Sequence, residues 1–200
     1  MPIRDVQLAV HQQNLGAIRR DADVVLIGDS LVQFWPAELA ARALGARRLL
    51  NYGVGLDRTQ HVLWRLQAPE LQALHPKLVV LLVGTNNLSA GDDACPIAAG
   101  IEAVAEHIQD LWPRARLTVI SVLPRGYDFA FRDADRTAIN VALKTRATSG
   151  RRWSFLDADE GISCGSKAPC EYYLPDAVHL SHRGYEVLSE LLKARAVRDR

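Results

Sequence analysis

The sequence has few cysteines and lacks the spacings that bind zinc. Three cysteines in 200 residues exclude a small scaffold held together by many disulfides. Neither a C-x-x-C pair nor an H-E-x-x-H motif occurs, so we expect no metal site. Cys164 and Cys170 bracket five residues and would pair if the protein is exported; otherwise we expect free thiols.

Long hydrophobic runs and an excess of one charge are absent as well. The longest aliphatic run, residues 78–83, is far shorter than the ~20 residues that cross a bilayer, so we expect no membrane span. No basic segment followed by an apolar stretch opens the chain, so no signal peptide is visible. The 24 Lys and Arg against 23 Asp and Glu leave a net charge of +1, which argues against nucleic acid or an anionic membrane as partner. We therefore expect a cytoplasmic protein, or a periplasmic or secreted one if the two cysteines pair.

The composition is that of an ordinary globular chain, with 48% hydrophobic and 24% charged residues. No repeat, low-complexity tract or linker divides the sequence. A typical domain has about 100–200 residues, so we expect residues 1–200 to form one domain. Whether two copies pair into a homodimer is left open by the sequence.

Short aliphatic runs alternate with helical patterns along the chain. The runs are residues 24–27, 48–51, 78–83, 117–122 and 153–156. Because they are rich in Val, Ile and Leu without alternation, they are typical of strands buried on both faces. Helical spacing of apolar residues extends over 97–111 and 185–192, with Ser181 placed to cap the second helix. Trp64 and Leu66 are expected to pack in the core.

The alternation predicts an α/β fold with a parallel sheet. Right-handed crossovers cover both faces of such a sheet with helices, which makes a three-layer α/β/α sandwich. Five strands favour a flavodoxin-like order, 2-1-3-4-5, over an eight-stranded barrel. In such sheets the ligand crevice lies at the carboxyl ends of the strands.

Side chains suited to acyl transfer come directly after the predicted strands. A Gly-Asp-Ser sequence ending at Ser30 follows the first run, and Asp176 and His179 lie in the loop before the last helix. A serine nucleophile needs a base, and the base needs an orienting group. We predict Ser30 as nucleophile, His179 as base and Asp176 as the group that orients it. Since Gly-Asp-Ser alone is more often a turn, a flavodoxin-like binding module is the alternative from another class.

The oxyanion of an acyl transfer needs hydrogen-bond donors that are fixed before the reaction. The candidates are the backbone N–H of Ser30, the side-chain amide of Asn86 after the third run, and a backbone N–H in the turn at Gly55 and Leu56. The plainer interpretation of Asn86 is a turn residue that makes local hydrogen bonds.

These motifs resemble the four blocks of the SGNH (GDSL) hydrolases. Longer strings are similar to the catalytic subunits of intracellular platelet-activating-factor acetylhydrolase. They cover residues 27–33, 51–55, 59–66, 83–87, 123–126 and 161–163. The resemblance runs from about residue 24 to the final helix. It implies a three-layer fold and a serine esterase without metal or organic cofactor, in which Ser30, Asp176 and His179 form the triad.

One residue departs from the family pattern. The resemblance places Leu56 where the family has a glycine whose backbone N–H, together with Asn86, completes the oxyanion hole. The donor is a backbone group, so leucine can supply it if its φ angle is tolerable, although its side chain would crowd the crevice. The departure motivates a second hypothesis, a catalytically weak or inactive subunit that binds a partner.

The substrate is expected to be a small acyl ester. Leu31, Thr85 and Val178 adjoin the triad in sequence and would wall an acyl pocket, and their bulk indicates a short, acetyl-sized chain. The alcohol half is not readable from the sequence, because the same blocks serve lipid, sugar, aryl and thioester substrates.

Overall fold

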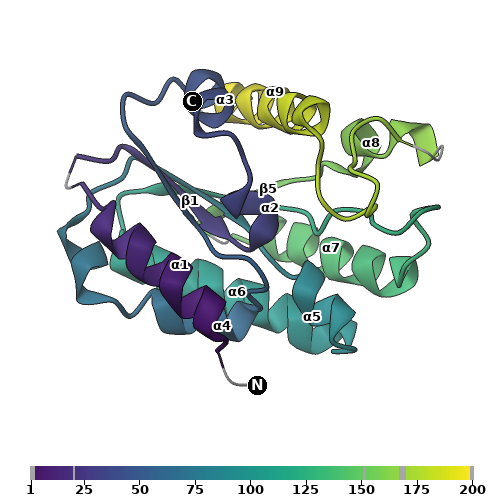
Figure 1. The fold of residues 1–200 in the computed structure, drawn as a ribbon, viewed down its shortest axis with the longest axis horizontal. Helices are drawn as coiled ribbons and strands as arrows, with labels where there is room; N and C mark the ends of the chain where they lie inside the picture. The colour runs from purple at the N-terminus through teal and green to yellow at the C-terminus, as the bar shows by residue number, and fades with distance from the viewer. Residues whose placement is uncertain (1–2, 20, 151, 167–169, 199–200) are drawn as a thin grey trace.

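A computed structural model describes residues 3–19, 21–150, 152–166 and 170–198. At its centre is a five-stranded, all-parallel sheet (Figure 1). The strands are β1 Val24–Gly28, β2 Leu49–Gly53, β3 Leu78–Leu82, β4 Arg116–Ile120 and β5 Trp153–Leu156. Their order is β2-β1-β3-β4-β5, which confirms the predicted topology.

Both faces of the sheet are buried, as the uninterrupted aliphatic runs predict. In β1, Val25 and Ile27 join one core cluster, whereas Leu26 joins the cluster on the opposite face. Successive side chains of a strand point to opposite faces, so a strand between two helical layers is apolar at nearly every position. The physical reason for the runs is therefore burial on two sides.

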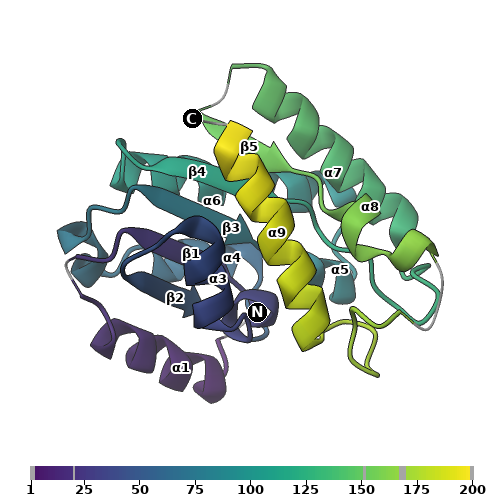
Figure 2. The same cartoon turned by 90° about the horizontal axis from the view of Figure 1, so that it is seen from above.

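Helices form the two outer layers (Figures 1 and 2). One face is covered by α1 Asp5–Gly16, α4 Thr59–Arg65, α5 Thr85–Ser89, α6 Ala94–Leu111 and α7 Asp133–Thr148. The other face carries α2 Ser30–Gln33, α3 Ala37–Leu44, α8 Asp159–Ile162 and α9 His182–Arg198. Short 3₁₀ turns, η1 Pro69–Ala73 and η2 Cys164–Ser166, lie in the connections. The three-layer α/β/α prediction is confirmed.

The predicted start of the last helix is confirmed in detail. The Ser181 hydroxyl accepts a hydrogen bond from the Gly184 backbone N–H at 3.1 Å, and α9 begins at the next residue, His182. A serine at this position satisfies one of the backbone donors that a helix leaves open at its start. The cap fixes where the preceding loop joins the helix.

One core prediction is wrong. Leu66 is buried, but Trp64 is 44% exposed. Val62 and Leu66 are four residues apart and share the inward face of the segment, whereas a residue two positions along lies on the other side of a helix. Trp64 instead packs edge-on against His11 of α1, with ring centroids 5.2 Å apart.

Cys164 and Cys170 form a disulfide. The third cysteine, Cys95, is free and exposed at the start of α6. No helix within the described ranges is long and apolar enough to cross a membrane.

Candidate active site

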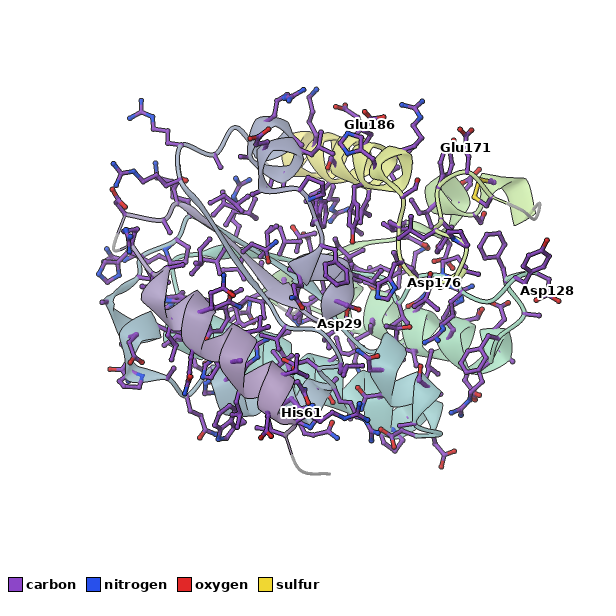
Figure 3. The ribbon with its side chains drawn as sticks, in the orientation of Figure 1. Asp29, His61, Asp128, Glu171, Asp176 and Glu186 are labelled. Atoms are coloured by element: carbon purple, nitrogen blue, oxygen red, sulfur yellow. A yellow bond between two sulfur atoms is a disulfide. The ribbon has the colours of Figure 1, made fainter. Side chains whose placement is uncertain are left out.

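The predicted site residues lie at the carboxyl ends of the strands. Ser30 is the first residue of α2, two positions after the end of β1, and Asn86 is the second residue of α5, the helix that follows β3. The loop that precedes α9 brings Asp176 and His179 to the same edge of the sheet; Figure 3 labels Asp176 together with Asp29, the neighbour of Ser30. The carboxyl ends of parallel strands meet at one edge, which is why segments 149 positions apart in sequence come into contact.

Ser30, His179 and Asp176 form a continuous chain of hydrogen bonds. The Ser30 Oγ lies 2.9 Å from Nε2 of His179, and Nδ1 of the same ring lies 2.7 Å from Oδ2 of Asp176. A neutral imidazole whose Nδ1–H donates to the carboxylate leaves Nε2 free to accept the serine proton. The arrangement has the geometry that a nucleophile, its base and an orienting group require.

The Asp176 carboxylate is held in place by backbone donors as well. Its Oδ1 accepts hydrogen bonds from the N–H groups of Val178 and His179, each at 2.9 Å. Burial acts to raise the pKa of Asp176, but the His179 ring and the two amides outweigh it and bring the pKa below its usual range. Asp176 therefore stays ionised next to the imidazole.

Asp29 braces the turn that presents Ser30. Its Oδ1 accepts from the Leu31 N–H at 2.9 Å and caps α2. Burial raises the pKa of this fully enclosed carboxyl to about 7. Gly28 is required just before it, because a Cβ at this position would lie 1.9 Å from the carbonyl oxygen of Leu82 in β3. Asp29 thus acts as the helix cap of α2.

The candidate oxyanion donors come from three segments. The turn after β2 closes with a hydrogen bond from the Asp57 N–H to the Val54 carbonyl at 3.3 Å. Within the described ranges, the backbone N–H groups of Ser30 and Leu56 have no acceptor in the protein. The Asn86 amide donates one hydrogen to the Asp57 carbonyl at 3.0 Å, and its second hydrogen remains for a ligand.

Leu56 adopts a left-handed backbone conformation, with φ of 65°. It is the third residue of the turn, a position that favours glycine when φ is positive. A leucine there carries a steric cost of about 1–2 kcal/mol. The side chain is 44% exposed and lines a small cavity of about 210 Å³ together with Arg58 and Asn86.

We expect Leu56→Gly to raise the free energy of unfolding by about 0.5–1 kcal/mol, because relief of the left-handed strain exceeds the chain entropy that glycine adds. Urea denaturation measures this change. Leu174→Gly is the matched control: Leu174 is 45% exposed and is not among the residues with positive φ, so glycine should destabilise the protein there. Equal losses at both positions would contradict the strain at Leu56.

The three residues expected at the acyl pocket differ in their surroundings. Leu31 is buried in the core on the α9 side of the sheet. The Thr85 hydroxyl is buried and accepts from Nη1 of Arg125 at 3.0 Å. Val178 is half-buried in the loop between Asp176 and His179. Their role at an acyl pocket stays a prediction.

Three residues near the site were missed in the sequence. Arg125 binds the Thr85 hydroxyl and carbonyl and interacts electrostatically with Asp29 and Asp176; burial lowers its pKa. Phe34 packs edge-on against the His179 ring at 5.4 Å, and Gln33 accepts from the Gly55 N–H at 2.6 Å. The strings 123–126 and 27–33 contain Arg125 and Gln33 and were the available signals. In the parts of the chain that the structure describes, no three His, Cys, Asp or Glu side chains are grouped as metal ligands.

Comparisons with known proteins identify the family of the chain and agree with its fold. The model of the GDSL-like Lipase/Acylhydrolase family matches residues 21–187. The chain is 34% identical to the human platelet-activating factor acetylhydrolase IB subunit alpha1 over 98% of its own length and 87% of the relative. It is also 34% identical to the human alpha2 subunit, over 83% of this chain and 72% of the relative. A solved GDSL-like lipase from Bacteroides thetaiotaomicron superposes with a TM-score of 0.74 at 18% identity, covering 98% of this chain and 99% of that one.

Proposed function

This chain belongs to the GDSL-like lipase/acylhydrolase family and is a carboxylic ester hydrolase, and we propose that it cleaves short-chain, acetyl esters through an acyl-enzyme on Ser30. The observation that carries the proposal is the hydrogen-bonded chain from the Ser30 hydroxyl through His179 to Asp176, with distances of 2.9 and 2.7 Å. A binding module has no need of this chain of groups.

The proposed reaction has two halves. Ser30 Oγ attacks the ester carbonyl carbon while His179 Nε2 takes the hydroxyl proton, and the tetrahedral oxyanion accepts from the N–H groups of Ser30 and Leu56 and from Asn86. The C–O bond to the alcohol then breaks, and the protonated imidazole gives its proton to the leaving oxygen. In the second half a water attacks the acyl carbon while His179 Nε2 takes its proton. The bond from that carbon to Ser30 Oγ then breaks, the carboxylic acid leaves, and the imidazolium returns the proton to Ser30 Oγ. Asp176 stabilises the imidazolium in both halves.

The acetyl assignment is supported by two observations. The relatives at 34% identity are named acetylhydrolases. The residues that flank the nucleophile and the base in sequence, Leu31 and Val178, are bulky, and Leu31 and Thr85 are buried, which suits a short acyl group.

A series of p-nitrophenyl esters from two to twelve carbons tests the acyl-chain assignment. We expect the largest kcat/KM for acetate and a steep fall with length. A fluorophosphonate that labels wild type on Ser30 would support the acyl-enzyme. A folded protein that turns over none of the esters and takes no label would instead favour the inactive, partner-binding subunit.

Asn86→Ala removes a proposed oxyanion donor, and we expect it to lower kcat by about 10²–10³-fold with little change in KM. Steady-state kinetics on p-nitrophenyl acetate measures both constants. Asn87→Ala is unsuited as a control because the Asn87 side chain holds Thr59 and Asp92. Gln67→Ala is a better match: Gln67 carries an exposed amide just after α4 and should retain kcat within about threefold, as for surface substitutions generally.

Two further features are part of the proposal. We take residues 1–200 as one hydrolase domain, since both core clusters pack on a single sheet. The Cys164–Cys170 disulfide supports the periplasmic or secreted alternative over the cytoplasmic one, because disulfides persist in oxidising compartments.

A further inference from the structure

Asp57 is a buried carboxylate that the proposed reaction does not use. It follows Leu56 in the turn after β2 and is 1% exposed. Its Oδ2 accepts from Nε of Arg65 at 2.6 Å, and its Oδ1 accepts from Nε2 of Gln7 at 2.7 Å. A buried ion pair is often no more stabilising than apolar residues of the same volume, so stability alone does not account for it. The pair is better explained by what it positions.

The Arg65 guanidinium joins Asp57 to the ends of two strands. Nη1 of Arg65 donates to the carbonyl of Tyr52 in β2 at 3.1 Å, and Nη2 donates to the carbonyl of Gly28, at the end of β1, at 3.3 Å. A planar guanidinium can hold several acceptors at fixed relative angles. The turn that carries the Leu56 N–H is thereby fixed against the Gly-Asp-Ser turn.

The backbone carbonyl of Asp57 is the link to the proposed oxyanion hole. It accepts one hydrogen of the Asn86 amide at 3.0 Å. The terminal torsion of an asparagine is broad, so a bond to one hydrogen is what aims the other. Any shift of Asp57 therefore changes where Asn86 points.

Gln7 reaches this turn from outside the sheet, on α1. Gln7 is 3% exposed, and both polar atoms of its side chain have hydrogen-bond partners. Besides Asp57, its Nε2 lies 3.3 Å from Nδ1 of His61. Its Oε1 accepts from the Arg4 N–H at 3.1 Å. Figure 3 shows His61 beside the start of α1. A second side chain of this helix, Asn14, donates to the Gly53 carbonyl at 3.0 Å. The α1 helix thus contacts both the last residue of β2 and the turn after it, although the family match begins at residue 21.

We propose that Gln7 is a positioning residue, which fixes Asp57 from α1 and, through the Asp57 carbonyl, sets the orientation of the Asn86 amide. This inference rests on the proposed function, in which Asn86 is an oxyanion donor. It makes α1 a part of the machinery that prepares the site, and not only a cover on the edge strand.

Gln7→Met tests the proposal, because methionine keeps the length and the helix propensity of glutamine and removes the amide. We expect kcat on p-nitrophenyl acetate to fall about 10-fold with KM nearly unchanged, since a misplaced oxyanion donor is felt in the transition state. Gln12→Met is the matched control, as Gln12 is exposed on the same helix. Measurements well below the melting temperature of each variant separate the effect from lost stability. A Gln7→Met kcat equal to that of the control would overturn the proposal.

A double-mutant cycle asks whether Gln7 acts through Asn86. In the Asn86→Ala background we expect Gln7→Met to lower kcat less than about 2-fold, because the amide it positions is gone. The same 10-fold loss in both backgrounds would overturn the proposal.

The side-chain NH₂ resonances of Asn86, assigned by their loss in Asn86→Ala, give a readout independent of activity. They should shift in Gln7→Met and stay in place in Gln12→Met. An unchanged Asn86 resonance in Gln7→Met would overturn the inference even with the proposed function intact. An active Ser30→Ala would overturn the proposed function, while the resonance still decides the positioning role.

Discussion

Ser30→Ala is expected to lower kcat on p-nitrophenyl acetate by about 10³-fold or more, as for a nucleophile that acts as a unit with its base. In the proposed reaction the Ser30 hydroxyl is the group that forms the acyl-enzyme. Alanine leaves the backbone N–H in place, so binding and part of the oxyanion hole remain. The residual rate measures what those groups contribute without covalent catalysis.

Fluorophosphonate labelling accompanies this measurement. Wild type should take one label and Ser30→Ala none, while the far-UV circular dichroism of the two proteins should be the same. Activity like that of wild type in a clean preparation of Ser30→Ala would contradict the assignment of the nucleophile.

His179→Ala is expected to be about as damaging, again about 10³-fold or more in kcat. Among the described contacts, the His179 imidazole is the only base within 2.9 Å of Ser30 Oγ. Without it, the proton of the Ser30 hydroxyl has no acceptor. Loss of the ring also removes the charge that Asp176 would stabilise. The double variant Ser30→Ala/His179→Ala should be no worse than either single one, because the two groups act in the same step.

His182 provides a matched control three residues along the chain. It is exposed at the start of α9, and its Nε2 lies 3.7 Å from a carboxylate oxygen of Glu186. We expect His182→Ala to retain kcat within about threefold, as for an exposed side chain away from the site. Comparable losses for His179→Ala and His182→Ala would show that the histidine assignment is wrong.

Much of the fold follows from local patterns in the sequence. Strands buried on two faces are apolar at nearly every position, so the runs were visible without tertiary information. The crossover rule and the number of strands then limit the topology to a few choices, and the predicted order agrees with the structure. Ser30, Asn86, Asp176 and His179 could be chosen as candidates because parallel strands end at one edge, and the structure places them there.

The sequence predicted less well in which direction individual side chains point. Trp64 is hydrophobic and lies between half-buried Leu63 and buried Arg65 in sequence, yet it faces outward because of where its position falls on α4. Leu56 was identified as a departure from the family, but its φ of 65° depends on how the turn closes between β2 and α4. Sequence patterns describe which residues can share a face, and they do not fix the rotation of a short helix or the torsions of a turn.

The amino-acid sequence by itself determined the strands, their parallel arrangement and the residue types gathered at one edge of the sheet. Only the tertiary structure decided which polar side chains meet beneath that edge. Gln7 and Arg65 reach Asp57 across 50 and 8 positions, from two different helices. Such contacts depend on the docking angle of each helix on the sheet, which is set by the packing of the whole core and leaves no local periodicity in the sequence.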